Sequence, residues 1–374
     1  MRLAMVTPFL EAYGGVEKVV MKIAQNFDST IYAASYKPER TYPEFKEMDV
    51  RVVGGGLGKM PGGERLASGA GAGLAFHSLK LHDYDVVNAH QSPSEWARNR
   101  NAPMIWYCHS PNREAYDLYE WRMQRRGPVQ KAAFWGAVKA FRSVEAGIVP
   151  KIEHIFTNSM NSRGRIKKYL KRDAEILHPG VEPKEFRCEG YGKFFFYPSR
   201  IVPEKEMEYA IEAFRRFSVR SKGWKLVIAG AASERPEHRK YLEKIRGMGV
   251  EGVSIRTNVG DGELKGLYAK CFSVLYTPVN EDFGLVPIEA MASSKPCIAR
   301  NEGGPKETIE SGKDGFLVGS AGEMAQRMGE LAERPEMAEE MGKAGRRKVV
   351  KDFTWSHFME RFGKKAEELA AGKV

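Results

Sequence analysis

Short apolar runs rich in valine, isoleucine and aromatic residues alternate with longer amphipathic runs along the whole chain. Near the start, residues 2–8 (RLAMVTP) predict a strand, and residues 14–27 (GGVEKVVMKIAQNF) predict a helix because apolar side chains return every three or four positions. Residues 193–199 (KFFFYPS) and 206–221 (EMEYAIEAFRRFSVRS) repeat this order in the second half. Strands that alternate with helices form parallel sheets covered on both faces. The pattern therefore predicts an α/β protein.

The same alternation continues through both halves of the chain. Further strands are predicted at residues 29–35, 49–55, 84–90, 102–109, 154–159, 224–230, 253–259, 273–279 and 295–301. Because 374 residues exceed one ordinary core, we expect two doubly wound, Rossmann-like domains with a cleft between them. Their expected bounds are 1–180 and 181–354. Ligands of such sheets bind beyond the carboxyl ends of the strands.

Residues 281–292 (EDFGLVPIEAMA) place two carboxylates, Glu281 and Glu289, eight positions apart around a glycine-containing turn. The apolar residues that follow predict a helix with Pro287 at its first position, which makes Val286 the expected N-cap. Valine has no side-chain oxygen for the first N–H groups, and such a helix N-terminus favours an anionic ligand. Alternatively, Glu289 occupies the first turn only because the helix dipole favours an acid there. That alternative leaves Glu281 unexplained.

Two cations follow the strand predicted at 193–199. Arg200 comes directly after it, and Lys205 follows five residues later at the entrance to a helix. Such a pair suits a diphosphate, because arginine binds oxygens in a bidentate manner and lysine acts as a point charge. Alternatively, Arg200 is a surface residue that pairs with Glu204 or Glu206. The two glutamates of the preceding motif favour the diphosphate.

The formal net charge is +11, and most of the excess lies in the first half of the chain. Residues 119–151 alternate basic side chains with tryptophan and phenylalanine. A basic, aromatic helix can contact anionic lipid head groups or nucleic acid. A solvated helix face packed on its own domain is equally compatible with the pattern. The charge alone does not decide among these three.

Cysteine usage and hydropathy indicate the compartment. The four cysteines form no CxxC pair and no zinc spacing, which is typical of a reducing cytoplasm. No apolar run approaches the roughly 18 residues that a membrane-spanning helix needs. The apolar stretch at the N-terminus is too short for a signal peptide. The sequence therefore predicts a cytoplasmic protein.

Arg200 and Lys205, followed by EDFGLVPIEAMA and by NEGGPKETI at residues 301–309, resemble the retaining glycosyltransferases of family 4, which have the GT-B fold. GGVEKVV near the start and FTWSHFMERF near the end extend this resemblance over essentially the whole chain. The resemblance implies that Arg200 and Lys205 neutralise a diphosphate leaving group. Fixed cations stabilise the charge that builds on such a group, so no metal cofactor is expected.

The resemblance also implies roles for the residues that would bind the donor. Glu289 would bind the ribose hydroxyls of a nucleotide sugar, and Glu281 the hydroxyls of the donated sugar. Backbone N–H groups would line the sugar and its phosphates, at Phe283, Gly284 and Leu285. Asn258 and Val259 stand where the family contacts the nucleobase, although RTNVGDGEL departs from the commoner pattern.

In the first domain, Gly14 and Gly15 follow the first strand and permit a ligand to approach the backbone closely. The family uses this loop against the diphosphate or the acceptor. The histidine that matches His109 faces the donor sugar and assists catalysis in the family. The alternative for His109 is a buried histidine with satisfied hydrogen bonds. His90 and Gln91 are weaker candidates for the acceptor side.

Two further stretches resemble ligand motifs. Residues 55–73 are rich in glycine but lack the order of a phosphate loop, so we expect a flexible loop. Asp83 and Asp85 form a DxD pair, which binds manganese in some glycosyltransferases. This pair directly precedes an apolar strand, and the metal interpretation is therefore disfavoured.

Within the family, CHSPNREAYDLY, EDFGLVPIEAMA and GGPKETI look most like GDP-mannose-dependent mannosyltransferases that extend O-antigen or lipid-linked oligosaccharide. The resemblance implies a lipid-linked or other glycan acceptor. It also implies a last helix, 355–374, that packs back on the first domain, and peripheral contact with the inner face of the cell membrane. No nucleic-acid partner is then expected. The alternatives are a UDP-sugar donor, a nucleotide-sugar epimerase and a non-catalytic basic binding protein.

Overall fold

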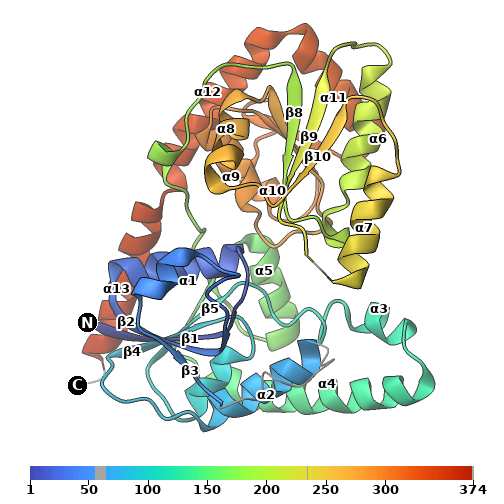
Figure 1. Ribbon diagram of the computed structural model, residues 1–374. Helices are drawn as coiled ribbons and strands as arrows, with labels where there is room; N and C mark the ends of the chain where they lie inside the picture. Colours follow the sequence, from blue (N-terminus) through green and yellow to red (C-terminus); the bar gives the residue numbers. More distant parts are fainter. Residues whose placement is uncertain (55–64, 234, 373–374) are drawn as a thin grey trace. The chain divides into compact units, whose positions relative to one another are not determined.

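The computed structural model describes residues 1–54, 65–233 and 235–372. The chain forms two compact units, Met1–His178 with Phe358–Val374, and Pro179–His357. The expected domain boundaries, at 180 and 354, fall within a few residues of these divisions. Helices cover both faces of the sheet in each unit (Figure 1). The expected α/β class with two doubly wound parallel sheets is confirmed.

The first unit is built on a seven-stranded sheet. Its strands are β1 (Arg2–Leu10), β2 (Asp28–Tyr36), β3 (Val50–Val52), β4 (Val86–His90), β5 (Met104–Cys108), β6 (His154–Thr157) and β7 (Glu175–Ile176). They are parallel and run in the order β3-β2-β1-β4-β5-β6-β7. The strand order reverses between β1 and β4, which is the place where doubly wound sheets bind ligands.

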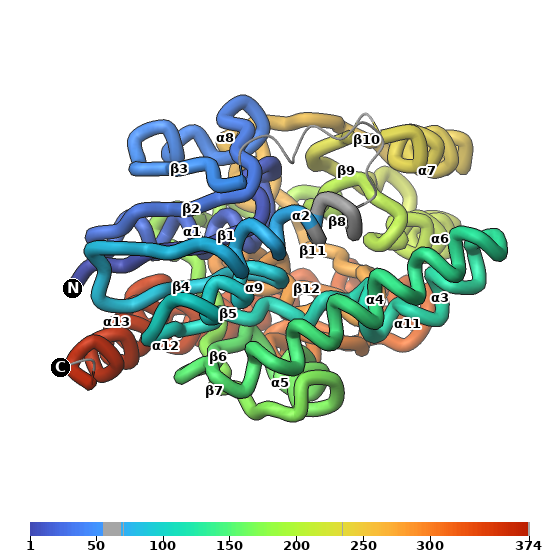
Figure 2. Tube along the Cα trace, turned by 90° about the horizontal axis from the view of Figure 1, so that it is seen from below, coloured from blue at the N-terminus to red at the C-terminus, as the bar shows by residue number. Residues whose placement is uncertain are grey.

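The helices of the first unit connect successive strands. They are α1 (Gly15–Asn26), α2 (Arg65–Ser78), α3 (Tyr119–Gln124), α4 (Pro128–Ile148) and α5 (Met160–Arg165), with α13 (Trp355–Ala371) added at the end of the chain. In α4 the buried residues recur at helical spacing: Phe134, Val138, Phe141, Glu145 and Ile148. Figure 2 views the first unit from the side that carries this helix.

The second unit repeats the architecture with six strands. They are β8 (Phe194–Pro198), β9 (Lys225–Gly230), β10 (Val253–Thr257), β11 (Ser273–Tyr276), β12 (Cys297–Arg300) and β13 (Gly315–Val318), in the order β10-β9-β8-β11-β12-β13. The helices are α6 (Met207–Ser218), α7 (Pro236–Arg246), α8 (Asp261–Lys270), α9 (Leu285–Ala292), α10 (Pro305–Thr308), α11 (Ala321–Glu333) and α12 (Pro335–Asp352). The order reverses between β8 and β11, as it does in the first unit.

The central strands of the second sheet are buried on both faces, which explains their continuous apolar runs. In β8, Phe195 and Tyr197 pack with Phe214 of α6 on one face. Phe196, on the opposite face, packs with Ile288 of α9. Because successive side chains of a strand point to opposite faces, the run FFFYP supplies two cores at once. Polar groups are therefore displaced to the ends of the strands.

Helix α13 completes the first unit with aromatic contacts. Phe362 lies 5.5 Å from Phe27, between ring centroids, and Phe358 lies 5.5 Å from Tyr107. Arg361 forms an ion pair of 2.6 Å with Glu175, at the start of β7. The residues from Phe358 onward thus belong to the first core.

The glycine-rich stretch 55–73 differs in part from the expectation. Residues 55–64 lie outside the described residues, but 65–73 are helical and form the first part of α2. The expected loop is therefore wrong for this part. A Cβ added at Gly73 would come 2.7 Å from the ring of Trp96. Small residues are needed there for packing, and they give a helix the composition of a loop.

Candidate active site

Helix α9 begins directly after the turn formed by residues 281–284 (EDFG). Its N-cap is Gly284, with φ +83°, and no side chain caps the helix there. The expected N-cap, Val286, is wrong by two positions, because Leu285 is already helical. Pro287 still lies in the first turn, where its missing N–H breaks no helical hydrogen bond. A Cβ at position 284 would come 2.9 Å from the ring of Tyr276, so this turn requires glycine.

Lys205 and Glu281 form an ion pair, although they are far apart in sequence. Lys205 Nζ lies 2.6 Å from Glu281 Oε2, and the two side chains are 13% and 27% exposed. Lys205 ends a short 3₁₀ turn after β8, and Glu281 follows β11, the neighbouring strand. The carboxyl ends of adjacent parallel strands thus bring the two charges together. Sequence reasoning gave each residue a separate ligand group and did not predict this pair.

Two glycines after β12 support the EDFG turn. Gly304 N donates to Glu281 O at 2.9 Å. A Cβ at Gly303 would collide with the backbone of Glu281, and one at Gly304 with that of Phe283. The sequence GGPKET therefore fixes the position of the turn. The resemblance includes these glycines but implies no role for them.

Glu289 has a buried partner that sequence reasoning missed. The hydroxyl of Tyr268, in α8, donates to Glu289 Oε2 at 2.9 Å. Burial, followed by the charge of Glu289, raises the pKa of Tyr268 well above its usual value of 10. Tyr268 therefore remains a donor and orients this carboxylate. Glu289 is the fifth residue of α9 and lies beyond its first turn, so the alternative that the helix dipole alone explains Glu289 is not supported.

The other predicted donor residues of this unit follow β8 and β10. Arg200 is exposed, and no described side chain forms an ion pair with it. Asn258 has φ +56°, and its Oδ1 accepts from Ala232 N at 2.9 Å. Val259 packs at the edge of the apolar cluster around α9. The nucleobase contact of Asn258 and Val259 stays a prediction.

In the first unit, Gly14 is the N-cap of α1 and Gly15 its first residue. Glu17 lies in the first turn of α1, and a Cβ at Gly14 would collide with its carboxylate. This acid already interacts favourably with the positive end of the helix dipole. The contact of this loop with the diphosphate or the acceptor stays a prediction.

His109 follows β5, and its ring lies against a second histidine. His90 Nδ1 and His109 Nε2 are 3.3 Å apart. His109 is 8% exposed and His90 is fully buried. Burial lowers the pKa of His109 to about 3 and lowers that of His90 well below 6.5. His90 therefore lies beneath His109 in the protein interior, and the suggested acceptor-side role for its side chain is not supported.

A pair of buried carboxyl groups, which sequence reasoning missed, lies beside the loop after β4. Ser92 Oγ joins the two acids, since it lies 2.7 Å from Glu95 Oε1 and 3.4 Å from Glu145 Oε1, and Tyr116 donates to Glu145. Burial raises the pKa of both carboxyl groups, and the charge of Glu145 raises that of Glu95 further. Two acids this close and this buried favour holding at least one proton. The pair joins α4 to the loop that carries Gln91.

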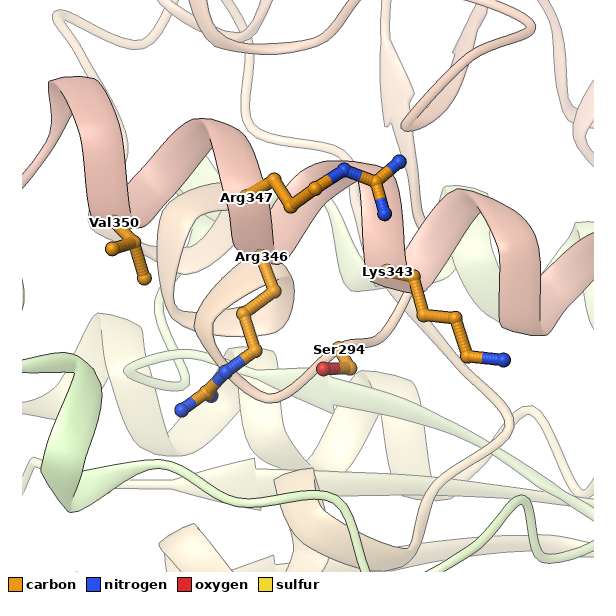
Figure 3. A pocket seen from close by; sticks show the side chains of 5 residues that line it. All are labelled: Ser294, Lys343, Arg346, Arg347 and Val350. Carbon is orange, nitrogen blue, oxygen red and sulfur yellow. The ribbon is translucent and has the colours of Figure 1, made fainter.

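Two other places resemble ligand sites. Asp85 accepts from the backbone N–H of Arg2 at 2.6 Å, at the amino end of β4. Within the described ranges, no group of three or more His, Cys, Asp or Glu could hold a metal ion. A shallow hollow beside α12 is lined by Ser294, Lys343, Arg346, Arg347 and Val350. Its guanidinium groups point away from each other (Figure 3), and that of Arg346 donates to backbone carbonyls.

Comparison with known proteins agrees with these features. The family described as "Glycosyltransferase Family 4" matches residues 13–185, and the family described as "Glycosyl transferases group 1" matches residues 182–348. The human alpha-1,3/1,6-mannosyltransferase ALG2 is 28% identical over 93% of this chain and 91% of its own length. A trehalose synthase of Pyrococcus horikoshii is 34% identical over 77% of this chain and 69% of its own length.

Solved structures share the fold at lower identity. Anabaena HepE in complex with UDP-glucose superposes with a TM-score of 0.76 at 16% identity, covering 99% of this chain and 100% of that one. Sucrose-phosphate synthase from Thermosynechococcus elongatus has a TM-score of 0.76 at 18% identity, covering both chains fully. Two doubly wound units of this kind are the GT-B fold of sugar-transferring enzymes. The chain belongs to the group 1, family 4 glycosyltransferases.

The requirement for glycine at the start of α9 gives a first prediction. Gly284→Ala should lower the free energy of unfolding by about 1–3 kcal/mol, because alanine is strained at this positive φ and meets Tyr276. The matched control is Gly266→Ala in α8, where a Cβ meets nothing within 4 Å. It should stabilise by about 0.5–1 kcal/mol. Equal changes in the free energy of unfolding of the two variants, measured in urea, would contradict the requirement for glycine at position 284.

The buried acid pair gives a second prediction. A carboxyl group with a raised pKa stays protonated in the folded state while the unfolded chain ionises. Its stabilisation is therefore present below the usual carboxyl pKa of 4.5 and is lost as the pH rises above it. Glu145→Gln should reduce the loss of unfolding free energy between pH 5 and pH 8, by about 1.4 kcal/mol for each unit by which the pKa is raised. An unchanged pH dependence would show that Glu145 is ionised throughout.

Proposed function

We propose that the chain transfers a mannosyl residue from GDP-mannose, with retention of configuration, to a hydroxyl group of a lipid-linked or other glycan. The supporting observation is the pairing of Lys205 with Glu281 beside the uncapped start of α9. The relatives named alpha-1,3/1,6-mannosyltransferase support the choice of sugar. A mannosyl donor needs both anion binding and hydroxyl binding, and this pair offers one group for each.

The pair suggests how the donor is bound. Before binding, Lys205 and Glu281 neutralise each other in a half-buried position. A diphosphate is a stronger partner for Lys205, since it carries more charge than one carboxylate. Its arrival would release Glu281 to accept hydrogen bonds from the sugar. Arg200, exposed at the end of β8, would complete the neutralisation of the leaving group.

Glu289 would hold the other end of the donor. Tyr268 orients its carboxylate, and a carboxylate accepts hydrogen bonds from the two adjacent hydroxyls of a ribose. Two cations supply the charge compensation that a metal supplies elsewhere, so the proposal includes no metal cofactor. The acceptor hydroxyl would attack from the face that the diphosphate leaves. A UDP-sugar is the second candidate donor, because the Anabaena neighbour HepE was solved with UDP-glucose.

The donor is tested by ligand-induced stabilisation. GDP and GDP-mannose at 100 times their Kd should each add about 2.7 kcal/mol to the apparent stability, and the gain should be lost in Arg200→Ala and Glu289→Ala. Arg220→Ala, an exposed arginine beyond the far end of α6, serves as the control and should behave like the wild type. Stabilisation by UDP compounds alone would show that the donor is a UDP-sugar instead of GDP-mannose. No stabilisation by any nucleotide would contradict the proposed function.

We further propose that the enzyme works at the inner face of the cell membrane and contacts anionic lipid through α3 and α4. In the part of the chain that the structure describes, no helix could span a membrane. The exposed aromatic residues Trp121 and Trp135 each lie under a cation: Arg125 is 3.7 Å from the Trp121 ring, and Lys139 is 4.9 Å from the Trp135 ring. Amphipathic rings flanked by cations suit the head-group region.

Vesicle binding tests this surface. The protein should sediment with vesicles that contain phosphatidylglycerol, and added salt should weaken the binding. Replacing Trp121 and Trp135 together by alanine should weaken it roughly 10-fold, a loss of about 1.4 kcal/mol. Val350→Ala, an exposed apolar residue of α12, is the control. Equal binding to neutral vesicles, or tighter binding to RNA than to vesicles, would contradict the membrane contact.

A further inference from the structure

A chain of hydrogen bonds leads from the backbone of β5 to the ring of His109. Asn88 Nδ2 donates to Ile105 O at 3.3 Å. Asn88 Oδ1 lies 2.7 Å from His90 Nε2, and His90 Nδ1 lies 3.3 Å from His109 Nε2. Asn88 and His90 are both fully buried. Each link therefore depends on groups of the protein itself.

This order of donors and acceptors fixes the position of each proton. A carbonyl oxygen only accepts, so the amide nitrogen of Asn88 faces Ile105 and its oxygen faces His90. His90 Nε2 must then carry a proton. Burial keeps the His90 ring neutral, so its Nδ1 has a lone pair and accepts. The proton between the two rings therefore belongs to His109 Nε2.

The protonation state of the other ring nitrogen of His109, Nδ1, follows from the same argument. The ring is neutral because of its burial, so Nδ1 carries a lone pair and no proton. Among the described residues Nδ1 has no hydrogen-bond partner, and it is not one of the buried unpartnered atoms. It therefore keeps contact with solvent, at the 8% of His109 that remains exposed.

We propose that Asn88 and His90 are positioning residues that hold His109 as a hydrogen-bond acceptor, with Nδ1 left to accept from a hydroxyl group of the sugar ligand. This inference rests on the proposed function for the identity of the ligand. In this tautomer His109 neither protonates the leaving diphosphate nor attracts it by charge. Its contribution is to recognise a ligand that carries a hydroxyl hydrogen at this position.

The tautomer is measured directly by long-range ¹H–¹⁵N correlation spectra of histidine-labelled protein, with assignments from His90→Gln and His109→Asn. We expect both rings to be neutral and protonated on Nε2 between pH 6 and pH 8. A protonated Nδ1 on His109, or a charged ring, would overturn the inference. This measurement needs no substrate, so its outcome is independent of the proposed function.

Asn88→Leu tests whether the relay sets the tautomer. It leaves His90 Nε2 without an acceptor, and a buried N–H without a partner is less tolerated than an unpaired lone pair. The proton of His90 should move to Nδ1, and His109 should then be protonated on Nδ1. Asn101→Leu is the matched control, since Asn101 is also buried and hydrogen-bonded in this unit. It should be destabilised without any change at His109, and a change there would overturn the relay.

The ligand contact is tested by titration calorimetry with GDP-mannose and its four monodeoxyfluoro analogues. One analogue should bind about 3- to 10-fold more weakly than GDP-mannose to the wild type, because fluorine cannot donate the hydrogen bond. In Asn88→Leu that difference should disappear, and in Asn101→Leu it should remain. The same differences in all three proteins would overturn the contact. Failure of GDP-mannose to bind the wild type would overturn the proposed function while the tautomer result stands.

Discussion

The burial of both faces of a parallel sheet is the constraint from which the rest of this structure follows. In each unit, helices cover both faces of the sheet, and alternate side chains of one strand enter two separate cores. A charge along such a strand would be buried, which is costly unless it is paired, whereas buried neutral groups such as Asn88 are hydrogen-bonded. Charged groups are therefore placed where strands end, and those ends lie at one edge because the strands are parallel. The ion pair of Lys205 with Glu281 is the direct result.

At that edge the backbones of two neighbouring turns are in close contact, which fixes their positions. The turn after β11 is held against the turn after β12, and a single added methyl group at either glycine of the pair would displace it. The packing leaves the start of α9 fixed in position while its side-chain cap is missing. A site made in this way is organised before any ligand arrives, which lowers the cost of binding.

The sequence predicted the fold class and the regions that carry the site, because those depend on local patterns. Periodicity located the strands and helices, and the spacing of Glu281 and Glu289 located the turn and helix start on which the proposed donor site is built. The pairing of Lys205 with Glu281 was not predictable in this way, since it depends on which strands are neighbours. The contact of His90 with His109 depends on the pairing of β4 with β5, which no local pattern contains. At Gly284, helix rules for proline favoured a later start than the turn geometry requires, and in α2 the glycines needed for packing against Trp96 suggested a loop.

The two connections between the units leave the second unit together. Val181 and Thr354 form a β-bridge, and Val181 N donates to Phe353 O at 2.9 Å. Gly180 has no room for a side chain against the backbone of residues 354 and 355. The second unit therefore has the topology of an insertion whose ends are joined. Once the second unit is folded, its two ends are held together. The chain that leads to α13 therefore starts beside the end of the first segment, and most of the loop-closure entropy has already been lost.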